Sequence, residues 1–282
     1  MLVDAHTHIF PTEVIAEREA LAKRDKTFGE LYGDPAAKLA RADELMAAIE
    51  RNGFDHAIAL GFAWSDPDLC RRHNDALLAA AAESRGRIVP FCTVDLAGPG
   101  NVLRTEIARC AAAGARGLGE LRPGSQGADL DGHAGELLAA CAAEFDLVLL
   151  FHASEPVGHS YPGKSGGELA MLARFVQRHP EVRVIFAHWG GGLPFYALMP
   201  EVRAALTNVW FDTAATTLLY EPAVYRQVAD LVGAERVLFG SDFPLLGPRR
   251  QLRALAAAPL DETERALIAG RNAAALLGFA GQ

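Results

Sequence analysis

Short apolar runs alternate with longer amphipathic segments from one end of the chain to the other. Eight of the short runs are mostly apolar on both faces, which is typical of parallel strands that helices cover. The predicted strands are Leu2–His6, His56–Gly61, Ile88–Val94, Ala115–Leu121, Leu147–His152, Val182–His188, Val209–Thr213 and Val237–Asp242. The alternation of strand-like and helical segments predicts an α/β fold with a parallel sheet.

The segments between these runs are rich in alanine and leucine and carry their charged residues on one side, as helices that cover a sheet do. The predicted helices are Ala36–Asn52, Asp68–Arg85, Asn101–Ala113, Asp131–Glu144, Gly166–Arg178, Leu193–Leu206 and Glu221–Val232. Asp261 and Glu264 form a capping-box pattern that begins a last helix, and Gly278 ends it.

Eight strand–helix units predict a single (β/α)8 TIM barrel over residues 1–282, with no added β-sandwich domain. A doubly wound open sheet is the alternative, which the lack of a glycine-rich dinucleotide loop disfavours. Two connections are longer than a barrel requires: Ile9–Pro35, which contains a predicted helix Thr12–Arg24, and Ala153–Gly167. Because long loops at the carboxyl ends of barrel strands carry lids and substrate contacts, we expect both to border the site.

Composition narrows the class of partner. Hydrophobic residues make up 50% of the chain, enough for a large core, and the net charge of −8 argues against nucleic acid and anionic membranes as partners. The four cysteines form no Cys-x-x-Cys pair, and the chain shows neither a signal-peptide pattern nor a bilayer-spanning apolar run. We therefore expect a cytoplasmic protein with a small-molecule substrate, and its oligomeric state stays open.

Imidazoles and carboxylates end five of the predicted strands. They are His6, His8, Glu120, His152, His188 and Asp242. The carboxyl ends of barrel strands meet at one mouth, so we expect these six side chains to converge. Buried groups of this kind are costly unless they are paired or bind a metal. Hydrogen-bonded core residues are the alternative, but the nitrogen and oxygen donors suit Zn²⁺, with Mn²⁺ or Fe²⁺ as other candidates.

Five motifs carry a family resemblance. They read D-A-H-T-H, G-L-G-E, F-H-A, A-H-W-G-G and G-S-D-F-P, and they run in order from Asp4 to Pro244. This pattern resembles the metal-dependent hydrolases of the amidohydrolase superfamily, in particular the amidohydrolase-related branch. That branch also contains zinc-dependent decarboxylases and hydratases, so the resemblance says more about fold than about substrate.

The resemblance implies roles for the strand-end residues. His6, His8, His152 and Asp242 would be metal ligands, and His188 would be a ligand of a second metal or a catalytic acid. Many relatives have a carboxylated lysine on the fourth strand where this chain has a glutamate, Glu120. Whether one or two metals bind therefore stays open.

The site chemistry predicts a metal-dependent hydrolase that directs activated water at a small amide, ester, lactone or related carboxylate. Asp242 would accept the proton of the water, and His188 would stabilise the developing oxyanion. A zinc-dependent nonoxidative decarboxylase is the first alternative, with Asp242 passing a proton to carbon. A catalytically silent barrel that binds a ligand is the second.

Several other residues are candidates for substrate contacts. They are Arg122 after the fourth strand, His159, Tyr161 and Lys164 in the loop after the fifth, and Trp189 after the sixth. Arg122 would bind a substrate anion, or else form an ion pair at the rim. The three loop residues would touch substrate or face solvent, and Trp189 would wall the pocket or pack in the core.

Overall fold

One eight-stranded parallel sheet, with its strands in chain order, forms the centre of the computed structural model, which describes residues 1–165 and 167–279. The strands are β1 (Val3–His8), β2 (His56–Leu60), β3 (Ile88–Cys92), β4 (Gly117–Leu121), β5 (Val148–Phe151), β6 (Val184–Phe186), β7 (Val209–Asp212) and β8 (Val237–Leu238). Each pairs in parallel with the next, at the registers Val3↔His56 and Phe211↔Val237 for example. All eight predicted strands are present. β1 ends two residues later than predicted, whereas β6 ends at Phe186, before His188, and β8 ends at Leu238, before Asp242.

Backbone hydrogen bonds close the sheet into a barrel. Ala5 N–H donates to the Phe239 carbonyl at 2.7 Å, and Asp242 N–H donates to the His6 carbonyl at 2.9 Å. Both bonds join β1 to the chain that follows β8. The predicted (β/α)8 TIM barrel is therefore confirmed, and no sheet edge is left open between the first and last strands.

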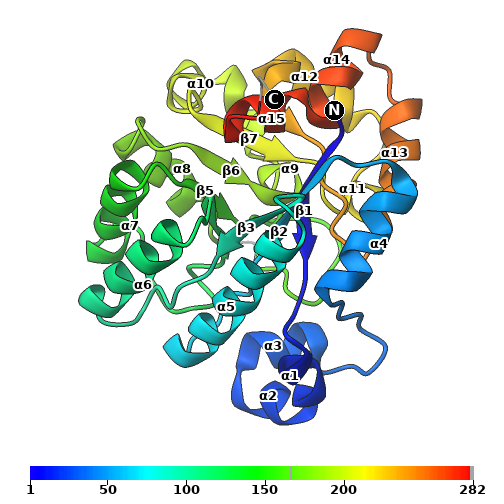
Figure 1. Ribbon diagram of the computed structural model, residues 1–282. Helices are drawn as coiled ribbons and strands as arrows, with labels where there is room; N and C mark the ends of the chain where they lie inside the picture. The colour runs from blue at the N-terminus through cyan, green and yellow to red at the C-terminus, as the bar shows by residue number, and fades with distance from the viewer. Residues whose placement is uncertain (166, 280–282) are drawn as a thin grey trace.

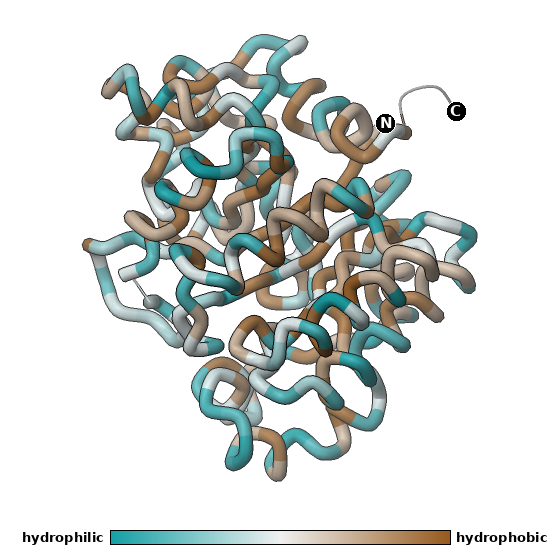
Figure 2. Tube along the Cα trace, turned by 90° about the vertical axis from the view of Figure 1, so that its left-hand side faces the viewer, coloured by the Kyte–Doolittle hydropathy of each residue, from teal (hydrophilic) through white to brown (hydrophobic). Residues whose placement is uncertain are grey.

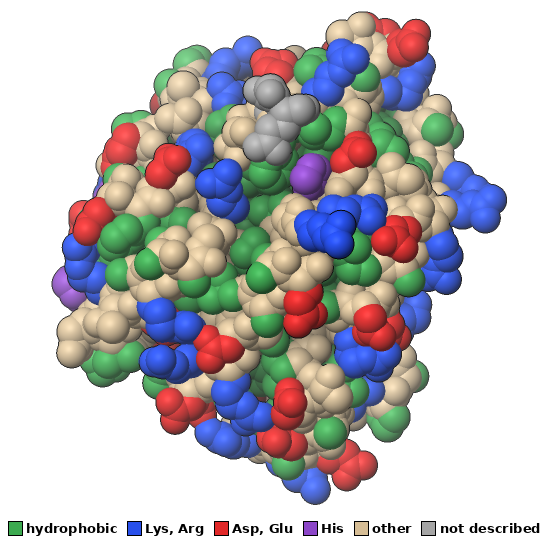
Figure 3. Space-filling view, viewed as in Figure 1, with side chains coloured by type: hydrophobic (Ala, Val, Ile, Leu, Met, Phe, Trp, Pro, Cys, Tyr) green, Lys and Arg blue, Asp and Glu red, His purple; other side chains and the backbone are tan. Residues whose placement is uncertain are grey.

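Helices surround the barrel on its outside (Figure 1). The larger ones are α4 (Ala42–Asn52), α5 (Pro67–Glu83), α6 (Gly100–Ala112), α7 (His133–Glu144), α8 (Leu169–Arg178), α12 (Val224–Val232) and α13 (Pro248–Ala257), of which α13 was not predicted. Short helices are α9 (Ala187–Gly190), α10 (Pro200–Ala205) and α11 (Thr216–Leu219), with 3₁₀ turns η1 (Leu193–Leu198) and η2 (Ala234–Arg236). Figure 2 shows hydrophilic residues mainly in the outer turns, and Figure 3 shows acidic and basic side chains interspersed on one face.

Two predicted helices are interrupted. The segment Leu193–Leu206 divides into η1 and α10, because Pro200, at the first position of α10, has no N–H to continue the earlier turn. The last helix keeps its capping box at Asp261 and its left-handed C-cap at Gly278, but it is split into α14 (Glu262–Ala266), a π-helical turn η3 (Leu267–Arg271) and α15 (Asn272–Leu277). The predicted start of α8 at Gly166 lies outside the described residues.

The connection after β1 folds into three short helices instead of the single predicted one. They are α1 (Thr12–Ala16), α2 (Arg18–Arg24) and α3 (Lys26–Tyr32). Asp25 begins α3, where its carboxylate accepts the Phe28 N–H at 2.8 Å. Aromatic rings hold this group together, and the Phe28 ring stacks on Trp64 with centroids 5.0 Å apart. In Figure 1 the three helices lie below the barrel, on the side toward which β1 runs.

Buried side chains of β1, β2, β3, β5, β6 and β8, including Phe91 and Leu150, form the interior cluster, and Trp210 of β7 packs against it. Leu276 and Leu277 of α15 pack against the same interior cluster. The opposite, carboxyl end is left for polar groups. None of the helices that the structure describes is both long and apolar enough to cross a membrane.

Close packing between strands predicts a strong stability effect at Gly117. A Cβ there would lie 2.4 Å from the Val148 carbonyl oxygen and 2.5 Å from the Phe91 ring. We expect Gly117→Ala to lower the free energy of unfolding by about 2–3 kcal/mol, since backbone cannot move aside cheaply. Gly247→Ala is the matched control, because nothing lies within 4 Å of its Cβ position. Urea unfolding followed by circular dichroism measures both, and equal midpoints would contradict this packing argument.

Candidate functional site

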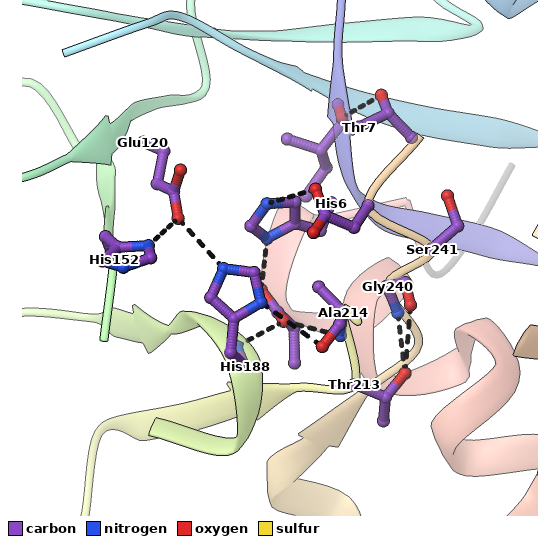
Figure 4. Close-up of polar contacts among 12 residues, drawn as sticks. His6, Thr7, Glu120, His152, His188, Thr213, Ala214, Gly240 and Ser241 are labelled. Carbon is purple, nitrogen blue, oxygen red and sulfur yellow. Dashed lines mark hydrogen bonds and ion pairs between the residues drawn. The ribbon is translucent and has the colours of Figure 1, made fainter. Parts of the chain in front are cut away.

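The polar residues predicted at the strand ends lie together, buried at the carboxyl end of the barrel. Figure 4 shows His6, Glu120, His152 and His188 of this group. His6 and His8 come from β1, and Glu120 comes from β4. His152, His188 and Asp242 follow β5, β6 and β8, and all six are less than 9% exposed. The six side chains therefore converge at one end of the barrel.

The two histidines of β1 form one half of the cluster. Their Nε2 atoms lie 3.1 Å apart, and each lies 3.8 Å from Asp242 Oδ1. Two imidazole nitrogens at that separation either share a proton or occupy adjacent positions around one metal ion, whose Zn–N bonds would be about 2.0–2.1 Å long. The donor set fits a divalent cation.

Glu120 joins this half of the cluster to the other. Its Oε2 lies 3.8 Å from His8 Nε2, whereas its Oε1 lies 2.9 Å from His152 Nδ1 and 3.5 Å from His188 Nε2. Two three-residue groups thus share Glu120: it pairs with His6 and His8 on one side, and with His152 and His188 on the other. A carboxylate placed between two pairs of imidazoles is suited to bridge two cations.

Asp212, at the end of β7, orients the imidazole of His6. Its Oδ2 accepts from His6 Nδ1 at 2.8 Å, and its Oδ1 accepts the backbone N–H groups of His188 and Ala214, each at 3.0 Å. This contact fixes the His6 ring so that Nε2 faces the cluster, as a carboxylate behind a metal-binding histidine does. Against the effect of burial, Asp212 raises the pKa of His6 to about 10, and His6 holds the pKa of Asp212 below its ordinary value.

Two other imidazoles, those of His8 and His152, are held in the neutral form that binds metal. Burial, aided by the charge of His6, lowers the pKa of His8 to about 4, and burial together with Arg122 lowers the pKa of His152 to about 4. Both rings are therefore neutral at pH 7 and keep a free lone pair. Two of their nitrogens, His8 Nδ1 and His152 Nε2, are buried without a hydrogen-bond partner among the described residues.

Left-handed backbone conformations aim two of the side chains into the cluster. His188 has φ 55° and Asp242 has φ 63°, a region that non-glycine residues rarely adopt. The chain turns sharply after β6 through Gly190, Gly191 and Gly192, which also have positive φ. Strained residues of this kind persist where surrounding contacts hold them, and they are concentrated at functional sites.

The candidate substrate contacts are distributed more widely. Arg122 is 4% exposed, lies two residues beyond Glu120, and donates through Nη2 to the Gly163 carbonyl. Tyr161 donates to Glu155 at 2.8 Å. The ammonium of Lys164 donates hydrogen bonds to carbonyls of its own loop, including that of His159 at 2.8 Å.

Trp189 does not reach the cluster. Its side chain is fully buried, its Nε1 donates to Thr216 at 2.9 Å, and its ring packs edge-on against Tyr225 with centroids 5.0 Å apart. The left-handed turn after β6 directs this indole into the apolar layer beneath α12. Trp189 is therefore a core residue here, rather than the pocket wall that its neighbouring glycines suggested.

Glu30 of α3 reaches the loop after β5 and was not predicted from the sequence. Its Oε1 accepts the Gly163 N–H at 2.8 Å. Burial, together with the charges of Asp242 and Glu120, raises the pKa of the Tyr32 phenol, and the charge of Arg122 opposes this shift. Neither residue carries a sequence signal, because a glutamate and a tyrosine in an amphipathic stretch look like ordinary helix surface.

A comparison with protein families matches residues 3–279 to the model described as amidohydrolase. The chain belongs to the amidohydrolase family. This match runs through all eight strands and includes every residue of the buried cluster.

Solved structures with a similar fold include three decarboxylases. A 5-carboxyvanillate decarboxylase from Sphingomonas paucimobilis is 18% identical, with a TM-score of 0.81 and 98% of each chain covered. A dihydroxybenzoic acid decarboxylase from Polaromonas sp. JS666, with bound manganese and 2-nitroresorcinol, is 16% identical (TM-score 0.78), covering 100% of this chain and 98% of its own. A 5-carboxyvanillate decarboxylase from Novosphingobium aromaticivorans is complexed with manganese and 4-hydroxy-3-methoxy-5-nitrobenzoic acid. It is 18% identical, with a TM-score of 0.81, and the match covers 99% of this chain and 96% of its own.

The position of Glu120 between two pairs of histidines predicts a change in metal count. We expect wild-type protein reconstituted with Mn²⁺ to hold about two ions per chain if the carboxylate bridges them, and Glu120→Gln to hold about one, since a neutral amide bridges poorly. Elemental analysis after gel filtration measures the ratio. A single ion in both proteins would contradict the bridge and leave Glu120 as a hydrogen-bonding or acid–base group.

Proposed function

We propose that this protein is a metal-dependent nonoxidative decarboxylase that acts on a small aromatic acid with a hydroxyl group beside its carboxylate. The observation that carries the proposal is a buried arginine, Arg122, next to the buried cluster of histidines and carboxylates that could hold a metal ion. Support also comes from the names of the similar structures, which are decarboxylases of hydroxylated benzoates. This proposal replaces hydrolysis, the first expectation from the sequence, as the leading function.

Arg122 has fewer partners than a buried guanidinium needs. Among the described residues it donates to one acceptor, the Gly163 carbonyl, and its Nε is buried without a partner. Burial raises the pKa of Glu168, and the charge of Arg122 opposes this shift. Among the described residues, no ion pair joins the two side chains. A buried cation of this kind is stabilised by an anion that accepts from its unused N–H groups. A substrate carboxylate supplies such an anion, whereas a neutral amide or ester does not.

The cofactor that fits the donor set is a divalent metal, held by His6, His8 and Asp242, with Glu120, His152 and His188 beside them. No thiol belongs to the cluster, so Zn²⁺, Mn²⁺ and Fe²⁺ all suit it. Manganese is the metal named in two of the similar structures, and it is the first to test. When bound, the cation supplies a Lewis acid that spreads the negative charge of the substrate oxygens.

The residues of the chain would move one proton. Asp242 would take the proton of the substrate hydroxyl and pass it to the ring carbon that bears the carboxylate. The bond from that carbon to the carboxyl carbon then breaks, its electron pair stays on the ring, and carbon dioxide leaves. A phenolate product remains, and the overall charge is unchanged. His188, whose Nδ1 lies 3.3 Å from the Ala214 carbonyl, would be held in place to hydrogen-bond the reacting oxygens.

Hydrolysis is the second candidate, favoured by the same donor set, since a cation held by imidazoles and carboxylates also activates water. Asp242 would then act as the base toward water. The two reactions differ in their products, carbon dioxide against an acid and a leaving group. A panel of hydroxybenzoates, amides, esters and lactones, scored for both products, separates them. Release of carbon dioxide by none of the hydroxybenzoates would overturn the main proposal.

Asp242→Asn tests the proton transfer. The amide still offers an oxygen to a metal but cannot carry a proton, so we expect kcat to fall by about 100-fold or more. Metal content and the thermal midpoint should stay close to wild type. Near-normal turnover with full metal content would exclude Asp242 as the proton carrier under either reaction.

Arg122→Ala tests the anion contact. We expect KM for carboxylate substrates to rise by about 10- to 100-fold, because hydrogen bonds to charged partners are lost. Arg122→Lys keeps the charge but not the forked geometry, so its KM should lie between the two. Turnover of neutral ester analogues, if any occurs, should not depend on this residue. An unchanged KM for carboxylates would show that Arg122 serves the fold alone.

A further inference from the structure

Gly163, in the loop after β5, connects three separate elements of the chain. Its N–H donates to Glu30 of α3 at 2.8 Å, and its carbonyl accepts from Arg122 at the end of β4. Its α-carbon also lies against α3, because a Cβ placed there would be 2.6 Å from Leu31 Cδ2. One peptide segment therefore links the two long connections to the guanidinium that we assign to substrate binding.

Little space surrounds this contact. The same Cβ position at Gly163 would lie 3.1 Å from Arg122 Nη2 and 3.3 Å from Nη1, and the residue has φ +84°, which favours glycine. The guanidinium thus packs directly against the Gly163 backbone. A shift of this backbone would change the position of Arg122.

Glu30 is the only described side chain that hydrogen-bonds the Gly163 N–H. A carboxylate that accepts a backbone N–H makes a stronger bond than a neutral acceptor does. Glu30 sits on α3, which Asp25 begins and aromatic packing against Phe10 and Phe62 stabilises. The carboxylate is therefore presented to the loop by a rigid support.

We propose that Glu30 is a positioning residue: through the backbone of Gly163 it sets the orientation of Arg122 for the substrate carboxylate, without touching substrate itself. This inference rests on the proposed function in taking Arg122 as the anchor of the substrate anion. It assigns a role in substrate affinity to the helices after β1, which otherwise contribute no residue to the buried cluster.

The first test uses the metal-loaded protein without substrate. Hydrogen exchange of peptides that cover residues 155–165 should be faster in Glu30→Ala, by about tenfold at the Gly163 amide, since its acceptor is lost. Glu30→Gln keeps an acceptor oxygen and should restore most of the protection. Glu19→Ala on α2 changes another exposed glutamate of this helix group and is the matched control, with no change expected.

The second test measures affinity for a benzoate probe, 4-hydroxy-3-methoxy-5-nitrobenzoic acid, by titration calorimetry. We expect Glu30→Ala to weaken binding by about 3- to 10-fold, and Glu30→Gln to bind nearly as wild type. In decarboxylation assays the same loss should appear in KM, with kcat changed less than about twofold, because the reacting groups are untouched.

A double-mutant cycle decides whether the effect passes through Arg122. In the Arg122→Ala background, adding Glu30→Ala should weaken binding no further, since the residue it positions is gone. A loss that persists in that background, or a Glu30→Gln variant as weak as Glu30→Ala, would overturn the proposal.

Failure of the proposed function has a different signature. If no benzoate binds wild-type protein, the decarboxylase assignment fails. The exchange experiment still reports on Glu30 in that case, because it needs no substrate. Unchanged exchange at Gly163 in Glu30→Ala would refute the positioning role whatever the reaction is.

Discussion

The buried hydrogen bond between Asp212 and His6 is the contact on which the arrangement of the cluster depends. Both side chains are fully buried, so neither charge has water to stabilise it. Asp212 also accepts the His188 and Ala214 N–H groups, which ties β1, β6 and β7 to one carboxylate. Because the His6 ring is held from behind, its Nε2 faces the cluster before any metal binds. Preorganisation of this kind lowers the cost of metal binding.

Glu120 in β4 and Arg122 just after it are both buried charged residues, but their hydrogen-bonding partners differ. Glu120 has two histidine partners at its Oε1, and these imidazoles hold its pKa well below its usual value although burial opposes the shift. Arg122 has one backbone acceptor and an unpartnered Nε. The carboxylate thus finds hydrogen-bonding partners within the protein, whereas the guanidinium has donors left for a ligand. Two charged side chains only two positions apart therefore differ in whether the protein itself supplies their partners.

The connections after β1 and β5 complete the site from outside the barrel. Three short helices, α1 to α3, pack against the segment after β2 and the start of α5 in a satellite core, in which Phe28 and Trp64 are fully buried. Such a core lets a connection between strands hold a side chain in a fixed place, which a flexible loop does not. Glu30 of α3 accepts the Gly163 N–H, and the Gly163 carbonyl in turn accepts from Arg122. The helices after β1 are thereby connected to the guanidinium. Loop identity, rather than the strands, is where members of one barrel family differ in substrate.

Periodicity alone determined the eight strands, most of the covering helices and the barrel, because burial on both faces of a parallel strand leaves a strong apolar signal. The convergence of His6, His152 and Asp242 was equally predictable, since parallel strands bring their carboxyl ends to one rim. Tertiary structure decided the rest. Trp189 enters the core because a left-handed turn redirects it, and Glu30 meets Gly163 across 133 positions of sequence. Contacts between distant loops depend on backbone paths that local sequence patterns do not encode.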